Sequence, residues 1–149
     1  RGTLDKFMGD AIMAFYGAPI SYDDDALRAV RTAVRMQESM KQLREKEPSL
    51  EEISFGAGVF TGYAVVGNLG SERLMNYTAI GDSPNSAKRL QENAKADQIL
   101  ICPATYEAVL EEVECEQTEP MLLKGKKAPI IAYEIKRLID ETATSVAGG

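Results

Sequence analysis

Carboxylate, amide and basic side chains at separate points of the chain have the types needed for chemistry on a phosphate compound. Asp10 follows Gly9 between two apolar runs, Asn85 and Arg89 are four residues apart, and Lys126 lies in a lysine-rich run over residues 123–127. Aspartate is a hard oxygen ligand that suits Mg²⁺, while arginine and lysine neutralise phosphate oxygens. The chain has no histidine, which excludes Ser-His-Asp and Cys-His nucleophile arrangements. The inventory therefore favours metal-assisted phosphate chemistry.

Each of these residues also has a purely structural interpretation. A Gly-Asp dipeptide such as Gly9-Asp10 is a common turn signal, and Lys6, four residues earlier, fits an exposed strand position. Asn85 and Arg89 fit a solvated helix face, and the lysine run fits an exposed turn. Residue types and spacing alone leave both interpretations open.

The first half of the chain predicts a hairpin, a long helix and a glycine-rich strand. Residues 4–16 read as two strands with Asp10 at the tip of the turn. Residues 23–46 carry apolar positions at helical spacing, with Asp23-Asp24-Asp25 as an acidic cap. Residues 53–68 predict a strand whose glycines allow close backbone approach, and residues 74–80 predict its hairpin partner.

The second half predicts the helix that carries Asn85 and Arg89. Ser83 is the expected N-cap and Pro84 the first helical residue, and the helix runs to about residue 94. Both polar side chains then project near the positive end of the helix, where anions are favoured. Further strands are predicted at 98–102, 113–118 and 130–135, with a helix at 103–110. The pattern predicts an α+β fold with helices on one face of a mostly antiparallel sheet.

Composition indicates one domain, over residues 1–138, followed by a flexible tail at 139–149. The chain has 149 residues, 44% hydrophobic and 27% charged, and a net charge of -6, which argues against binding to nucleic acid. No apolar run is long enough to span a membrane, so no membrane contact is expected from these residues. The two cysteines have no metal-type spacing and fit a reducing, cytoplasmic setting.

Several stretches together resemble the class III adenylate and guanylate cyclases. They are DKFMGDAIMA at 5–14, GYAVVGNLG at 62–70 and YTAIGDSPNSAKRL at 77–90, of which the third is highly specific. LKGK at 123–126 and AYEI at 132–135 close the resemblance, which extends to about residue 138. It implies a ferredoxin-like, cyclase-type fold and conversion of ATP to 3′,5′-cyclic AMP and pyrophosphate.

The resemblance also implies a role for each candidate residue. Asp10 would be one of two carboxylates that bind a pair of divalent cations, Mg²⁺ or Mn²⁺, which activate the ribose 3′-hydroxyl for attack on the α-phosphorus. Asn85 would orient the ribose, Arg89 would stabilise charge on the α-phosphate, and Lys126 would hold the terminal phosphates.

The resemblance also implies the base specificity, because the positions that match Lys6 and Thr78 contact the purine in the family. Guanylate cyclases typically have glutamate at the lysine position, so a lysine facing the acceptor N1 of adenine favours ATP over GTP. Sites in the family form between two subunits, with Asp10, Lys6 and Thr78 facing the partner's Asn85 and Arg89. We therefore expect a head-to-tail homodimer.

One departure from the family concerns the metal. Family domains begin with a strand that carries the first metal-binding aspartate, and this chain begins after it, so the fold is expected to lack that strand. Asp5 is expected to be a poor substitute, because strand alternation places it opposite Lys6. The 149 residues alone are then expected to be weakly active or inactive. A non-catalytic nucleotide-binding or dimerisation module and a guanylate cyclase are the alternative hypotheses.

Overall fold

The N-terminal hairpin forms as the sequence predicts. The computed structural model describes residues 1–139. Strands β1 (Thr3–Met8) and β2 (Ala11–Phe15) pair antiparallel, and Gly9, at φ 62°, forms the turn with Asp10 at the tip. The register shifts between Leu4 and Lys6, which marks a bulge at Asp5. This bulge interrupts the strict alternation on which the expected orientation of Asp5 rested.

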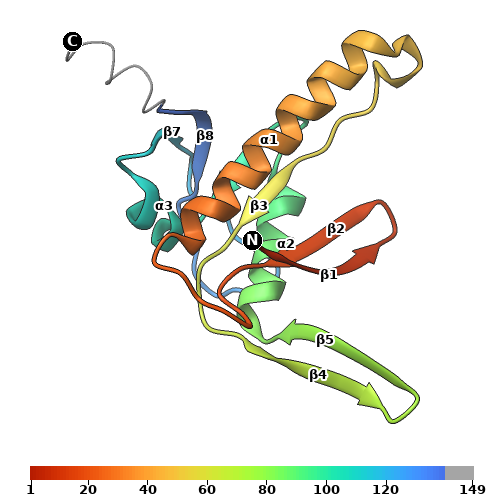
Figure 1. Cartoon of the computed structure of the whole chain (residues 1–149). Coiled ribbons are helices and arrows are strands. Elements are labelled where there is room, and N and C mark those ends of the chain that lie inside the picture. Colours follow the sequence, from red (N-terminus) through yellow and green to blue (C-terminus); the bar gives the residue numbers. More distant parts are fainter. Residues whose placement is uncertain (140–149) are drawn as a thin grey trace, which may run out of the picture.

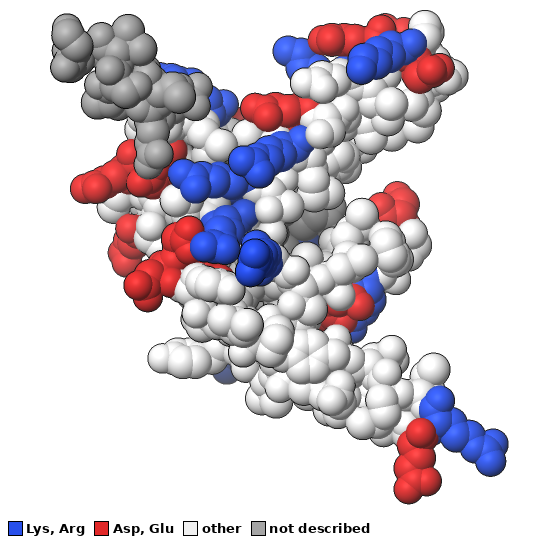
Figure 2. All heavy atoms as spheres, viewed as in Figure 1, with Lys and Arg blue, Asp and Glu red and all other residues white. Residues whose placement is uncertain are grey.

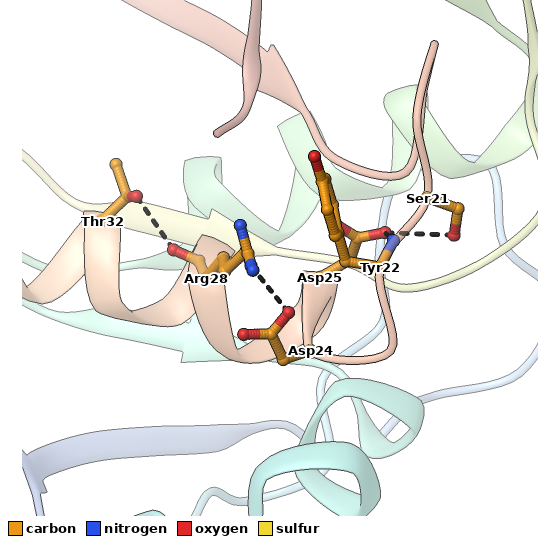
Figure 3. A network of polar contacts seen from close by, with 6 residues as sticks. All are labelled: Ser21, Tyr22, Asp24, Asp25, Arg28 and Thr32. Atoms are coloured by element: carbon orange, nitrogen blue, oxygen red, sulfur yellow. Dashed lines mark hydrogen bonds and ion pairs between the residues drawn. The ribbon is translucent and has the colours of Figure 1, made fainter.

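The long helix α1 (Asp25–Lys46) is also confirmed, but its acidic triplet does not cap it as predicted. Asp24 is the N-cap residue and makes no side-chain capping bond. Its carboxylate instead accepts a 2.6 Å hydrogen bond from Arg28, whose guanidinium lies over the Tyr22 ring, while Asp25 accepts from the Tyr22 backbone N–H at 2.8 Å (Figure 3). Arg28, one helical turn further along α1, competes with the helix N–H groups for the Asp24 carboxylate, which explains why the predicted cap does not form. A short 3₁₀ turn, η1 (Pro48–Leu50), follows α1.

The glycine-rich segment forms two strands, not the one that was predicted. Strand β3 (Ala57–Val59) ends before residues 60–64, and β4 (Val65–Ser71) then pairs antiparallel with β5 (Leu74–Ile80). The two strands belong to different sheets. The β4–β5 hairpin projects away from the rest of the chain as an arm (Figure 1).

Helix α2 (Asp82–Asn93) begins earlier than expected. Gly81, at φ 130°, occupies the N-cap position, and the Ser83 hydroxyl donates to the Tyr63 carbonyl at 2.5 Å instead of capping the helix. The predicted Ser83 cap is therefore wrong, because a residue distant in sequence supplies the acceptor. Asn85 is the fourth of the twelve helical residues and lies near the start of the helix as expected, whereas Arg89 is the eighth, one helical turn further on.

The remaining elements complete a four-stranded sheet. They are β6 (Ile99–Ile101), α3 (Pro103–Val109), β7 (Val113–Gln117) and β8 (Tyr133–Leu138), and the strand order is β3-β6-β8-β7. Strand β8 begins three residues later than predicted, since Ile130 forms only an isolated bridge with Met121. The β3–β6 pair is parallel and the other pairs are antiparallel. The predicted tail lies, except for residue 139, outside the described residues.

The expected α+β class is confirmed, but the predicted placement of the helices on one face of the sheet is wrong. Ile99 and Ile101 of β6 pack with Val30 of α1, whereas Leu100, between them, packs with Leu90 of α2. Because successive side chains of a strand point to opposite faces, α1 and α2 cover opposite faces of the sheet (Figure 1). Among the described helices, none has the length and apolar character needed to cross a bilayer.

Gly58 fixes how closely α2 approaches the sheet. A Cβ at this position would lie 2.5 Å from the backbone N of Gln91 and 2.7 Å from the carbonyl O of Ala87. Gly58→Ala is therefore expected to lower the free energy of unfolding by about 1–3 kcal/mol, because backbone atoms must shift to admit the methyl group. Urea denaturation measures the change. Gly67→Ala, which meets nothing within 4 Å, is the matched control, and equal effects of both substitutions would contradict this account.

Candidate active site

One group of candidate residues assembles where β1 packs against β5. Thr78 is buried, with 7% exposure, and its hydroxyl donates to both carboxylate oxygens of Asp5 at 2.7 and 2.8 Å. The Lys6 ammonium lies 3.8 Å from the same carboxylate, and the Lys6 side chain is 45% exposed. Lys6 and Thr78, 72 positions apart in the numbering, are thus brought together through Asp5.

A second group assembles between α2 and the loop over residues 123–127. The Lys126 ammonium donates to the Asp82 carboxylate at 2.5 Å. The Arg89 guanidinium lies against Gly125, because a Cβ on that glycine would be 3.2 Å from one of its nitrogens. Asn85 is exposed, one helical turn before Arg89. The group therefore places two cations beside the first turns of a helix, an arrangement that can bind phosphate oxygens.

The Lys126–Asp82 pair has a measurable electrostatic consequence. The hydrogen bond from Lys126 is the main factor that lowers the pKa of Asp82 below its ordinary value of 3.8, with Arg89 contributing in the same direction. Since the carboxylate is the form stabilised on folding, the contribution to stability is present above the ordinary pKa. It is lost as the pH falls through the lowered value.

Lys126→Met is therefore expected to raise the pKa of Asp82 toward its ordinary value. The measurement is a titration of the Asp82 carboxyl carbon by NMR in both proteins. Lys124→Met is the control, because Lys124 is exposed in the same loop and is not the partner of Asp82 in this ion pair. An unchanged Asp82 titration in Lys126→Met would show that the pair does not form in solution.

Asp10 is exposed at the hairpin tip, where a carboxylate is accessible to a cation. Within residues 1–139, no group of three or more histidine, cysteine, aspartate or glutamate side chains is arranged to hold a metal ion. Asp5 is not accessible as a second ligand, since its side chain is 2% exposed and both of its oxygens face the Thr78 hydroxyl. Residues 1–139 therefore do not by themselves fit a two-ion centre.

The structure connects the predicted residues within each group but not across the two groups. Among residues 1–139, hydrogen bonds and ion pairs join Asp5 with Lys6 and Thr78, and Lys126 with Asp82, while none joins one group to the other. Sequence reasoning assigned no function to Asp5 or Asp82. Their contacts span 73 and 44 positions in the chain, respectively, so no local spacing signal pointed to them.

The fold agrees with the comparison to known proteins. Residues 6–137 match the family described as the adenylate and guanylate cyclase catalytic domain. The chain belongs to this family.

The relatives include cyclases of both nucleotide specificities. An adenylate cyclase 1 of Rhizobium meliloti is 28% identical over 99% of this chain and 23% of its own length, and the terminal-differentiation specific adenylate cyclase of Dictyostelium discoideum is 34% identical over 90% of this chain and 6% of its own. The chain thus spans less than a quarter of these curated relatives. The crystal structures of the adenylyl cyclase CyaB of P. aeruginosa and the guanylyl cyclase Cya2 each share 34% identity over 94% of this chain and 72% of theirs, with TM-scores of 0.82 and 0.86.

Proposed function

We propose that this domain is an adenylate cyclase that converts ATP to 3′,5′-cyclic AMP and pyrophosphate. The observation that carries the proposal is the arrangement of Lys6 and Thr78 around one carboxylate, because a lysine donor at this position suits the acceptor N1 of adenine. Family membership indicates the reaction class, and the proposed contacts of Lys6 and Thr78 with the base favour ATP as the substrate.

The side chains of this domain would act by positioning and charge stabilisation. Asn85 would orient the ribose, and Arg89 would stabilise the charge that develops on the α-phosphate. Lys126 would give up its ion pair with Asp82, and its ammonium would then hold the terminal phosphates. Asp10 would be a ligand of the divalent cations, which in this reaction class activate the 3′-hydroxyl, together with oxygen ligands that the described residues do not provide.

A head-to-tail homodimer with shared sites is part of the proposal. It is supported by the absence, among residues 1–139, of any hydrogen bond or ion pair that joins the base-binding group to the phosphate-binding group. The β4–β5 arm adds further support, since it exposes Val65 at 65%, Leu74 at 68% and Met75 at 54%. Figure 2 shows this arm as largely uncharged, with charged side chains at its tip. Exposed apolar surface of this kind marks interaction sites.

The test is cyclic nucleotide production from ATP and from GTP, with Mn²⁺ and with Mg²⁺. It is run on these 149 residues and on the chain extended at its N-terminus, because the solved relatives extend beyond the matched region. Cyclic AMP formed preferentially supports the proposal. Preference for GTP supports the second candidate, a guanylate cyclase, which the likeness to Cya2 favours. Absence of product from both chains would support a non-catalytic module.

A further inference from the structure

The carboxylate of Asp5 lies between the two residues proposed to contact the purine. Its side chain is 2% exposed, accepts from the Thr78 hydroxyl at 2.7 and 2.8 Å, and lies 3.8 Å from the Lys6 ammonium. We propose that Asp5 makes Thr78 an obligatory hydrogen-bond acceptor toward the base, and so determines selection of adenine over guanine. This inference rests on the proposed function, in which Lys6 and Thr78 face the purine.

The polarity of the Thr78 hydroxyl is the central point. A threonine hydroxyl has one proton to donate and two lone pairs that accept, so by itself it suits either a donor or an acceptor on a base. A carboxylate only accepts. Because both oxygens of Asp5 are turned toward Thr78, the single proton is committed to Asp5 and only lone pairs remain for the base.

Burial holds this arrangement in place. At 2% exposure, the Asp5 carboxylate has almost no contact with water that could replace the hydroxyl as its hydrogen-bond donor. A buried carboxylate left without a donor is costly, so rotation of the Thr78 proton toward a ligand is disfavoured. The backbone N–H of Ala79 lies 3.4 Å from the same carboxylate and adds a weaker donor on the β5 side.

The resulting pattern of one donor beside one acceptor matches adenine and opposes guanine. Lys6 only donates, which suits the acceptor N1 of adenine, and Thr78 then accepts from the exocyclic amino group at position 6. Guanine reverses both groups, with a donor at N1 and an acceptor oxygen at position 6. It would place donor against donor and acceptor against acceptor, which is a strong basis for rejection.

Asp5→Asn tests the inference, because an asparagine amide can donate to Thr78 and thereby free the threonine proton. The ATP:GTP ratio of kcat/KM, and the ratio of the two Kd values measured by calorimetry with Ca²⁺ in place of Mg²⁺, are expected to fall roughly tenfold or more. Asp23→Asn, the same chemical change at an exposed carboxylate before α1, is the control. In a Thr78→Val background, which lacks the hydroxyl, Asp5→Asn is expected to leave both ratios unchanged. Unchanged ratios in folded Asp5→Asn would overturn the inference.

A ligand series on the unmodified protein covers the case in which Asp5→Asn does not fold. The triphosphates of adenosine, purine riboside and inosine carry, respectively, a donor, no group and an acceptor at position 6. Affinity is expected to fall in that order, and inosine triphosphate binding as tightly as ATP would overturn the inference. Discrimination between the triphosphates, without product formation by either the 149 residues or the N-terminally extended chain, would instead refute the proposed cyclase activity and leave the role of Asp5 supported.

Discussion

Replacing Arg89 with alanine is expected to lower kcat for cyclic AMP formation on the order of 100-fold or more. The reason is that the guanidinium would stabilise charge that appears on the α-phosphate only in the transition state, and loss of a comparable oxyanion donor has an effect of this size. The KM for ATP is expected to change far less. Initial rates over a range of ATP concentrations separate the two parameters.

Arg35→Ala is the matched control for this experiment. Arg35 is exposed on α1, so its removal makes the same change in charge and side-chain size away from the proposed site. Circular dichroism verifies that Arg89→Ala retains the overall secondary structure. An Arg89→Ala protein that retains the activity of the Arg35→Ala protein would remove Arg89 from the mechanism.

Mixing two inactive variants is expected to restore about a quarter of the unmodified activity, if the site is shared between subunits. Asp10→Ala removes a site residue at the tip of the β1–β2 hairpin, and Arg89→Ala removes a site residue of α2. Random pairing makes about half of the dimers mixed, and each mixed dimer contains one site with both residues intact and one with neither. Activity measured after unfolding and refolding the two chains together gives the recovered fraction.

The control for mixing uses two variants of the same helix. Arg89→Ala with Asn85→Ala is expected to give no recovery, since every site in a mixed dimer then lacks one of the two α2 residues. If Asp10→Ala with Arg89→Ala also gives no recovery, although size-exclusion chromatography shows dimers, then the two groups do not complete one another across an interface. A single chain would then have to supply both groups.

Local sequence determined most of the elements that carry the candidate residues. The Gly9-Asp10 turn between apolar runs was enough to predict the hairpin, because a positive φ at glycine and strand pairing are local properties. The helix with Asn85 and Arg89 was likewise predictable from its periodicity. The predicted Ser83 cap was wrong because the carbonyl of Tyr63, brought close by the fold, accepts the hydroxyl proton.

Only the tertiary structure decided which charged groups meet. A bulge in β1 turns Asp5 toward Thr78, and packing of the 123–127 loop on α2 brings Lys126 to Asp82. Neither contact could be predicted from the spacing of residues in the sequence, since each joins elements far apart in the chain. The sequence by itself thus determined the family, the elements and the residue types available for chemistry. The hydrogen-bond polarity of those residues depends on neighbours that the fold supplies, because a hydroxyl or a carboxylate acquires its role from the partner it faces.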